Sequence, residues 1–135
     1  MHAKRYAQER GANLVEAALV ISLVLLPILV GVPDLGRVYF TYITIINAAR
    51  EGARWGVTHP LDAGGICAKV LGEAQTQPLH LSSPLSCANI QIENSGGASG
   101  SPIRVTVQVD FPLILGGILG RPTLPIRYSV AFPIF

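Results

Sequence analysis

The fold is decided by the stretch LVEAALVISLVLLPILVGV, residues 14–32. Apart from Glu16 the stretch carries no charge, and the sequence has no charged residue at all from 17 to 33. A helix rises about 1.5 Å per residue, so these residues would cover roughly 29 Å, close to the roughly 30 Å hydrocarbon core of a bilayer. We therefore predict a transmembrane helix here.

Charge is scarce and lies mainly ahead of this stretch. Charged residues make up 13% of the 135, against about 25% in typical soluble domains. Lys4, Arg5 and Arg10 precede the apolar run, opposed only by Glu9. This basic flank predicts a cytoplasmic N-terminus, with most of the chain outside. A net charge of +2 is too small to indicate nucleic-acid binding.

A cleaved secretory signal peptide is the first alternative, because it too has a basic start and an apolar core. However, no A-x-A cleavage site follows the run, which continues as PDLGRVYF, residues 33–40.

Glu16 is an ionisable residue inside the predicted span, and such a side chain in a membrane helix usually marks a function with a nearby partner. The competing interpretation is that Glu16, near the edge of the span, reaches the aqueous boundary and has no role.

Three motifs follow one another over residues 10–60. The first, RGANLVE at 10–16, places Glu16 five residues after Gly11 at the start of the apolar run. The second is the pair Gly36 and Arg37. The third is AAREGAR, comprising Ala48, Ala49, Arg50, Glu51, Gly52, Ala53 and Arg54. In this order the three motifs resemble the TadE-like family of pseudopilins, found in Tad-type type IV pilus systems.

The resemblance implies that a prepilin peptidase cuts between Gly11 and Ala12 and removes residues 1–11 as a leader. Glu16 would then lie one helical turn from the new amino terminus. In pilin-like filaments such a carboxylate is thought to meet the terminal amine of a neighbouring subunit, so Glu16 becomes the candidate assembly residue.

The function implied is that of a minor pilin or pseudopilin in a Tad-type pilus for surface adhesion. Its implied partners are other pilin-like subunits (identical or different) bound through the N-terminal helix, the prepilin peptidase, the pilus assembly platform and membrane lipid. Its implied location is the inner membrane, then the extracellular pilus. The alternatives are the main filament subunit of such a pilus and an uncleaved single-pass membrane scaffold.

We expect no enzyme, no catalytic residue, no cofactor and no nucleic-acid partner. The sequence has no G-x-S-x-G motif, no P-loop and no dinucleotide-binding glycine pattern after a strand.

The long helix is expected to cover residues 12–57, with the span at about 14–33. Pro27 and Pro33 predict a kink or a local opening, since each removes a backbone hydrogen bond. The expected packing face consists of Val38, Tyr42, Ile45 or Ile46, Ala49 and Ala53. The expected opposite, polar side consists of Arg37, Thr41, Thr44, Asn47, Glu51 and Arg54.

The AAREGAR motif allows two interpretations. Its small residues permit close approach of a sheet or helix, and we favour packing of this helix on the sheet through the alanines. Its arginines could instead recognise a partner.

Residues 58–135 read as a small extracytoplasmic domain. An amphipathic helix is predicted at 66–75, and alternating patterns predict strands at 88–93, 103–110 and 123–132. The expected fold class is α+β: a long pilin-like transmembrane helix, a short second helix, and a small antiparallel three-stranded sheet packed on the outer half of the long helix.

Two further features lie in this domain. Cys67 and Cys87 are predicted to form a disulfide, the alternative being two buried thiols, and their spacing fits no metal site. The apolar segment FPLILGGIL, residues 111–119, is expected to be a buried loop covering the sheet end, or else an exposed patch for a neighbouring subunit or the membrane.

Overall fold

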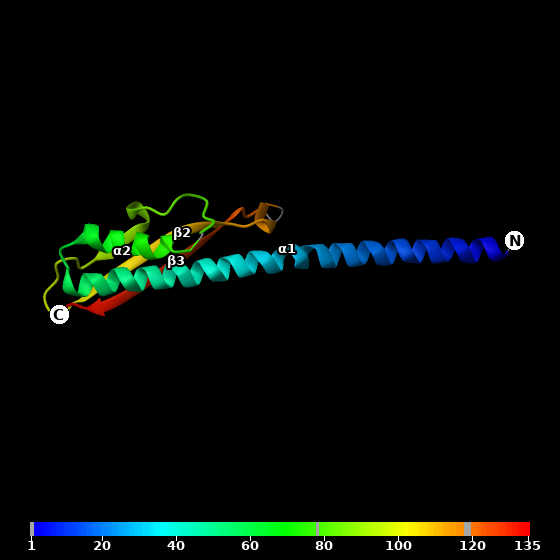
Figure 1. Cartoon of the computed structure of the whole chain (residues 1–135). Coiled ribbons are helices and arrows are strands. Elements are labelled where there is room, and N and C mark those ends of the chain that lie inside the picture. Colours follow the sequence, from blue (N-terminus) through cyan, green and yellow to red (C-terminus); the bar gives the residue numbers. More distant parts are fainter. Residues whose placement is uncertain (1, 78, 118–119) are drawn as a thin grey trace.

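The computed structural model describes residues 2–77, 79–117 and 120–135, and the side chains of these except for 2–10 and 12. Figure 1 shows one long helix with all other elements gathered along its C-terminal half. The helices are α1 (His2–Thr58) and α2 (Ala63–Gln75), and the strands are β1 (Ile90–Glu93), β2 (Pro102–Pro112) and β3 (Thr123–Pro133). Short 3-10 turns occur at η1 (Cys87–Asn89) and η2 (Leu115–Gly117). The predicted α+β class is confirmed.

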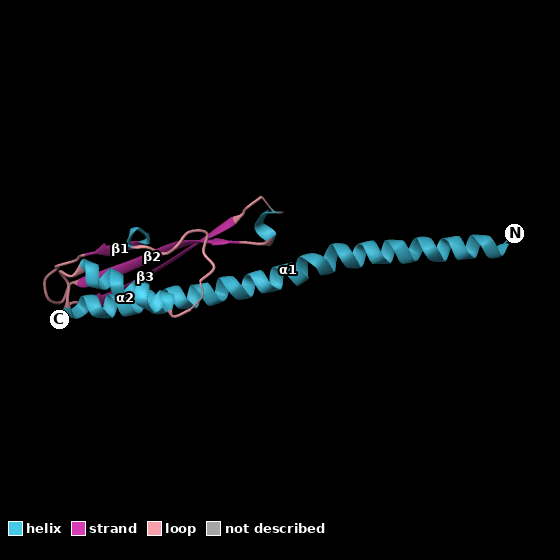
Figure 2. Cartoon of the chain, turned by 45° about the horizontal axis from the view of Figure 1, so that its top comes forward, coloured by secondary structure: helices cyan, strands magenta, loops and turns pink. Residues whose placement is uncertain are grey.

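Helix α1 is continuous over its 57 residues, which corresponds to roughly 86 Å. It begins before the expected start at Ala12 and ends one residue beyond Val57. Pro27 and Pro33 both lie inside it without interrupting it, so no local opening occurs. Figures 1 and 2 show only a slight change of direction near its middle. Hydrogen bonds elsewhere in the helix keep it continuous where each proline removes one.

The two halves of α1 have different surroundings. From Leu14 to Val32 the large apolar side chains are exposed, for example Leu23 at 78%. From Asp34 onward one face is buried against the other elements. Its members are Asp34, Thr41, Thr44, Ile45, Ala48, Ala49, Gly52, Ala53, Gly56 and Val57.

This face differs from the predicted one. Thr41 and Thr44 are buried, at 2% and 5% exposure, although we expected them on the polar side. Tyr42, expected in the packing face, is 40% exposed and meets Tyr128 of β3 edge to face. Thr44 tolerates burial because its hydroxyl donates to the carbonyl of Phe40 at 3.1 Å. The AAREGAR motif has small residues at neighbouring positions, 48 with 49 and 52 with 53. Two adjacent faces of the helix can therefore pack closely, and the buried face is displaced from the predicted one.

The sheet is antiparallel in the order β1-β2-β3. Val107 pairs with Ile90 of β1 and with Tyr128 of β3. The inward side chains of β2, at alternate positions from Ile103 to Phe111, are buried, as the predicted alternation requires. Figure 2 shows the sheet lying along the outer half of α1, with α2 beside it.

The first strand is shorter than predicted. Residues 88 and 89 belong to η1 rather than to β1. The cause is local: the Asn89 side chain accepts hydrogen bonds from the backbone N–H and the hydroxyl of Ser86, at 3.0 and 3.1 Å. Such a side-chain bond to the backbone competes with extension into a strand.

Cys67 of α2 and Cys87 of η1 form a disulfide, with their Cα atoms 5.7 Å apart. The bridge closes the irregular segment between α2 and the sheet over a sequence separation of 20. It therefore ties the start of β1 to α2, in a domain with a small core.

Replacing both cysteines by serine (Cys67→Ser with Cys87→Ser) should lower the free energy of unfolding of the outer domain by about 3 kcal/mol, because the unfolded chain regains its loop freedom. Thermal unfolding in detergent, followed by circular dichroism, measures the loss. Reductant should destabilise the wild type and leave the double variant unchanged; a wild type indifferent to reductant would contradict the bridge.

Candidate assembly surface

The N-terminal half of α1 presents an uninterrupted apolar surface with one acidic side chain near its start. Gly11 and Glu16 are both exposed on this continuous helix, and the Ala12 side chain lies outside the described residues. The backbone passes from Gly11 to Ala12 within α1. Of the part of the chain that the structure describes, one helix is long and apolar enough to cross a membrane, Asn13–Thr58.

The second motif lies where the exposed half of α1 meets the packed half. Gly36 is exposed with open space around it. The Arg37 guanidinium lies 3.2 Å from the Asp34 carboxylate and 5.0 Å from the centre of the Phe111 ring. Asp34, only 4% exposed, also accepts a hydrogen bond from the backbone N–H of Leu115 at 2.9 Å. Arg37 of the pair thus supports a contact that joins α1 to β2 and the turn after it, whereas Gly36 makes no contact there.

The small residues of AAREGAR are buried, and Gly52 lies at the contact between α1 and α2. Ala48, Ala49 and Ala53 are fully buried. A Cβ atom placed on Gly52 would collide with Val70 Cγ2 and lie 3.3 Å from the carbonyl oxygen of Ile66, both in α2. The motif therefore packs, as we expected, but at Gly52 its close contact is with α2 and not with the sheet.

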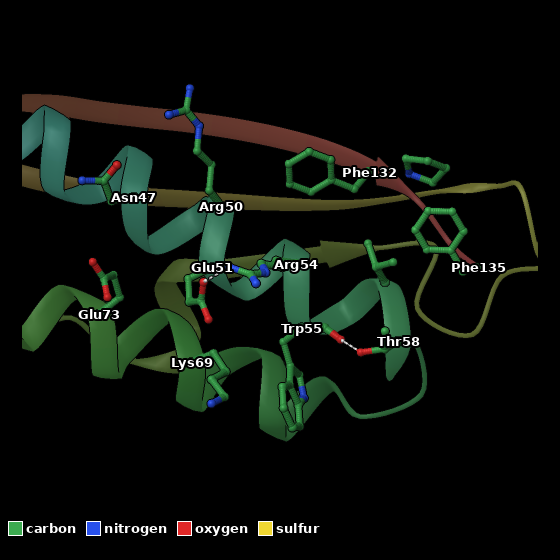
Figure 3. A pocket seen from close by; sticks show the side chains of 12 residues that line it. Asn47, Arg50, Glu51, Arg54, Trp55, Thr58, Lys69, Glu73, Phe132 and Phe135 are labelled. Carbon is green, nitrogen blue, oxygen red and sulfur yellow. Dashed lines mark hydrogen bonds and ion pairs between the residues drawn. The ribbon is translucent and has the colours of Figure 1, made fainter.

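The charged members of the same motif face outward. The Arg54 side chain is 83% exposed and approaches Glu51 at only 4.0 Å, so this ion pair contributes little to stability. Figure 3 shows Arg50 and Glu51 extending on different sides of α1. The arginines are therefore free to contact another molecule.

These side chains line a groove of about 920 Å³ between the end of α1, α2 and the end of β3. Its cations are Arg50, Arg54 and Lys69, and its carboxylates are Glu51 and Glu73. Aromatic rings border it as well (Figure 3). The lining residues are Asn47, Arg50, Glu51, Arg54, Trp55, Val57, Thr58, Lys69, Glu73, Phe132, Pro133 and Phe135.

Trp55 organises one side of the groove. The Lys69 ammonium lies 4.7 Å above its ring centre, and the His59 ring stacks on it at 4.1 Å. Its indole N–H donates to the Asp62 carboxylate at 3.4 Å. These contacts join α1 to α2 at the far end from the membrane span.

Sequence reasoning missed two parts of this surface. Asp34 had a usable signal, since an acid three residues before Arg37 at the edge of an apolar run suggests a pair on one helix face. The groove gave no signal in the sequence, because its residues Lys69 and Phe132 come from elements far from α1 in the chain.

Among the described residues, no group of three or more His, Cys, Asp or Glu side chains could hold a metal ion.

These features first define a class: a membrane-anchored protein with a long pilin-like helix that carries a small α+β domain on its outer half. Residues 11–54 match the family model described as TadE-like protein, which confirms the resemblance, and this segment of the chain is TadE-like. The match begins at Gly11 and ends at the last residue of AAREGAR. No curated protein and no solved structure matches the chain.

The match over residues 11–54 and the apolar helix together suggest a membrane-anchored protein of the pilus-associated kind. The family is structural rather than enzymatic. The surface described above fits that kind of protein, because its chemistry is that of contacts: a bare apolar helix, a tightly packed small-residue face and an outward-facing charged groove.

The close packing at Gly52 yields a stability prediction. Gly52→Ala should lower the free energy of unfolding, because an overpacked methyl group costs about 1–3 kcal/mol, more than the gain in helix propensity. Gly72→Ala is the matched control: its Cβ would meet nothing within 4 Å, so it should raise stability by up to about 1 kcal/mol. Urea unfolding in detergent compares the two; equal stabilisation by both would refute the packing role.

The exposed charge at Arg54 should behave differently from the buried glycine. Arg54→Ala is expected to change the unfolding free energy by no more than about 0.5 kcal/mol in the same urea titration, since surface substitutions rarely do more. A loss comparable with that of Gly52→Ala would show that the arginine, too, is part of the packing.

Proposed function

We propose that this chain is a minor pilin or pseudopilin that a prepilin peptidase cuts between Gly11 and Ala12 and that then takes part in assembling a Tad-type pilus for surface adhesion. Residues 1–11 are the leader, residues 12–57 the mature helix and residues 58–135 the extracytoplasmic domain. The leader faces the cytoplasm, and the outer domain reaches the extracellular pilus after assembly.

One observation carries this proposal: the same helix is bare and apolar over its first half and packed over its second. Leu14 and Leu23 are 71% and 78% exposed, whereas Ile45 and Ala49 are fully buried. The bare half fits lipid, and after assembly it fits the helices of other pilin-like subunits. The outer domain already covers the buried face of the packed half.

The pairing of Glu16 follows from electrostatics in an apolar bundle. A carboxylate moved out of water is costly unless an opposite charge and hydrogen bonds compensate it. Cleavage after Gly11 would create a new ammonium on Ala12, one turn away on the same helix face. In a bundle of such helices, the ammonium of one subunit can compensate the carboxylate of its neighbour.

Cleavage itself is the first test. The mature protein from its native membrane is expected to begin at Ala12, which intact-mass and N-terminal sequence analysis would detect. Gly11→Leu is expected to leave the full chain unprocessed, because it puts a bulky side chain directly next to the bond that is cut. The fold should not suffer, because a Cβ on Gly11 meets nothing within 4 Å.

The outcome also separates the alternatives. A native chain that retains Met1 would contradict the proposal and favour the uncleaved single-pass scaffold. A cleaved chain that forms most of the filament mass would make it the main subunit.

Glu16 provides the second test. Glu16→Ala should insert into the membrane normally and fail to enter filaments, because an uncompensated partner in a buried charge pair costs about 3–5 kcal/mol. Glu16→Gln should fail in the same way, which separates the charge from the size of the side chain. Quantitative blotting of membrane and sheared-pilus fractions measures both variants.

Glu9→Ala is the control, because it removes a carboxylate that the assembled subunit would no longer contain. It is expected to assemble as the wild type does. Normal filament incorporation of Glu16→Ala would refute the pairing role.

A further inference from the structure

The turn between β2 and β3 lies beside α1 at the level where the exposed apolar half ends. We call residues 113–117 and 120–122 the hairpin tip. Two backbone hydrogen bonds close it, Leu113 to Pro122 at 2.9 Å and Arg121 to Gly116 at 2.8 Å. Figure 2 shows this turn reaching further toward the N-terminal half of α1 than any other part of the outer domain.

Direct contacts hold the tip at this height. The Leu115 N–H donates to the Asp34 carboxylate, and the Leu115 side chain lies 4.0 Å from the Cβ position of Gly31. Because Gly31 and Asp34 flank the end of the predicted span, the tip sits where the helix would leave the bilayer. At the opposite end of the domain, the Pro60 carbonyl accepts a hydrogen bond from the Gly96 N–H at 2.8 Å. Thr58, the last residue of α1, lies roughly 36 Å beyond Asp34 along the helix axis.

The chemistry of the tip matches this position. Ile114 is 60% exposed and does not belong to the described hydrophobic core. The sequence from Phe111 to Gly120 carries no charge, and the next residue, Arg121, is an exposed cation. In the sequence of α1, Val32 and Leu35 flank the contact residues Gly31 and Asp34 and are 62% and 70% exposed, so both the tip and the end of the span carry exposed apolar side chains. An apolar turn followed by a basic residue suits the boundary between acyl chains and phosphate groups.

We propose that the hairpin tip rests in the outer surface of the membrane that α1 crosses, with Ile114 among the upper acyl chains and Arg121 at the level of the lipid phosphates. This rests on the proposed transmembrane placement of α1. The contact gives the outer domain a second attachment to lipid, so before assembly its groove is held at a constant height and orientation. Entry into a filament then requires the tip to leave the lipid.

The test measures depth in lipid for the full chain. Ile114→Cys, labelled with a nitroxide, is reconstituted into vesicles of phosphatidylcholine and phosphatidylglycerol, and its collisions with oxygen and with a water-soluble nickel chelate are compared. Val24→Cys, in the span, and Ser99→Cys, in the loop at the far end of the domain, are the matched controls. The native cysteines are paired and do not take the label.

The label at 114 is expected to favour oxygen over the chelate, as at 24, while the label at 99 favours the chelate severalfold. A label at 114 that behaves like the one at 99 overturns the inference, and so does one shielded from both reagents, which would place the tip against a neighbouring protein. A label at 24 that favours the chelate overturns the membrane placement of α1 itself, and with it this inference.

Discussion

The outer domain depends on the close approach of other elements to α1 at Gly52 and Gly56. A Cβ on Gly56 would lie 2.8 Å from Ile103 of β2 and 3.0 Å from Ile66 of α2, so both layers converge on positions that have no side chain. Close-packed interiors leave no room for an added atom there. The small residues of these helix turns lie on the buried face. Arg50 and Arg54 occupy positions between them in the sequence and therefore lie on other, exposed faces of the same turns.

The second constraint is the change of surroundings along one helix. A helix satisfies its own backbone hydrogen bonds, so its first half can be apolar on all sides in lipid. The change comes at Asp34, a buried carboxylate that would be costly there without partners. Arg37 and the Leu115 N–H supply them, and the same bonds fix the height of the hairpin tip. The hydrogen bond between Asp34 and Leu115 thereby sets how the domain stands relative to the apolar half of α1.

Much of the fold could be predicted because it follows from local patterns. The alternation in 103–110 and 123–132 lies within the observed β2 and β3, and the small residues of AAREGAR are buried. The errors have equally local causes. Thr41 and Thr44 are buried because the small residues of AAREGAR allow two adjacent faces of α1 to pack, and the face that packs includes both threonines. Residues 88 and 89 leave the strand because the Asn89 side chain bonds back to Ser86.

By itself, then, the sequence determined the single long helix, its apolar first half, the order of the three motifs and the alternating strands. These depend on composition and on periods of 2 and about 3.6 residues, which neighbouring positions encode. Only the tertiary structure decided which face of the outer half of α1 is buried, that Asp34 receives the Leu115 N–H, and that Lys69 and Phe132 share a groove with Arg54. These contacts join residues that are distant in the sequence. They depend on how the packed elements are arranged, which the spacing of apolar residues within one element does not specify.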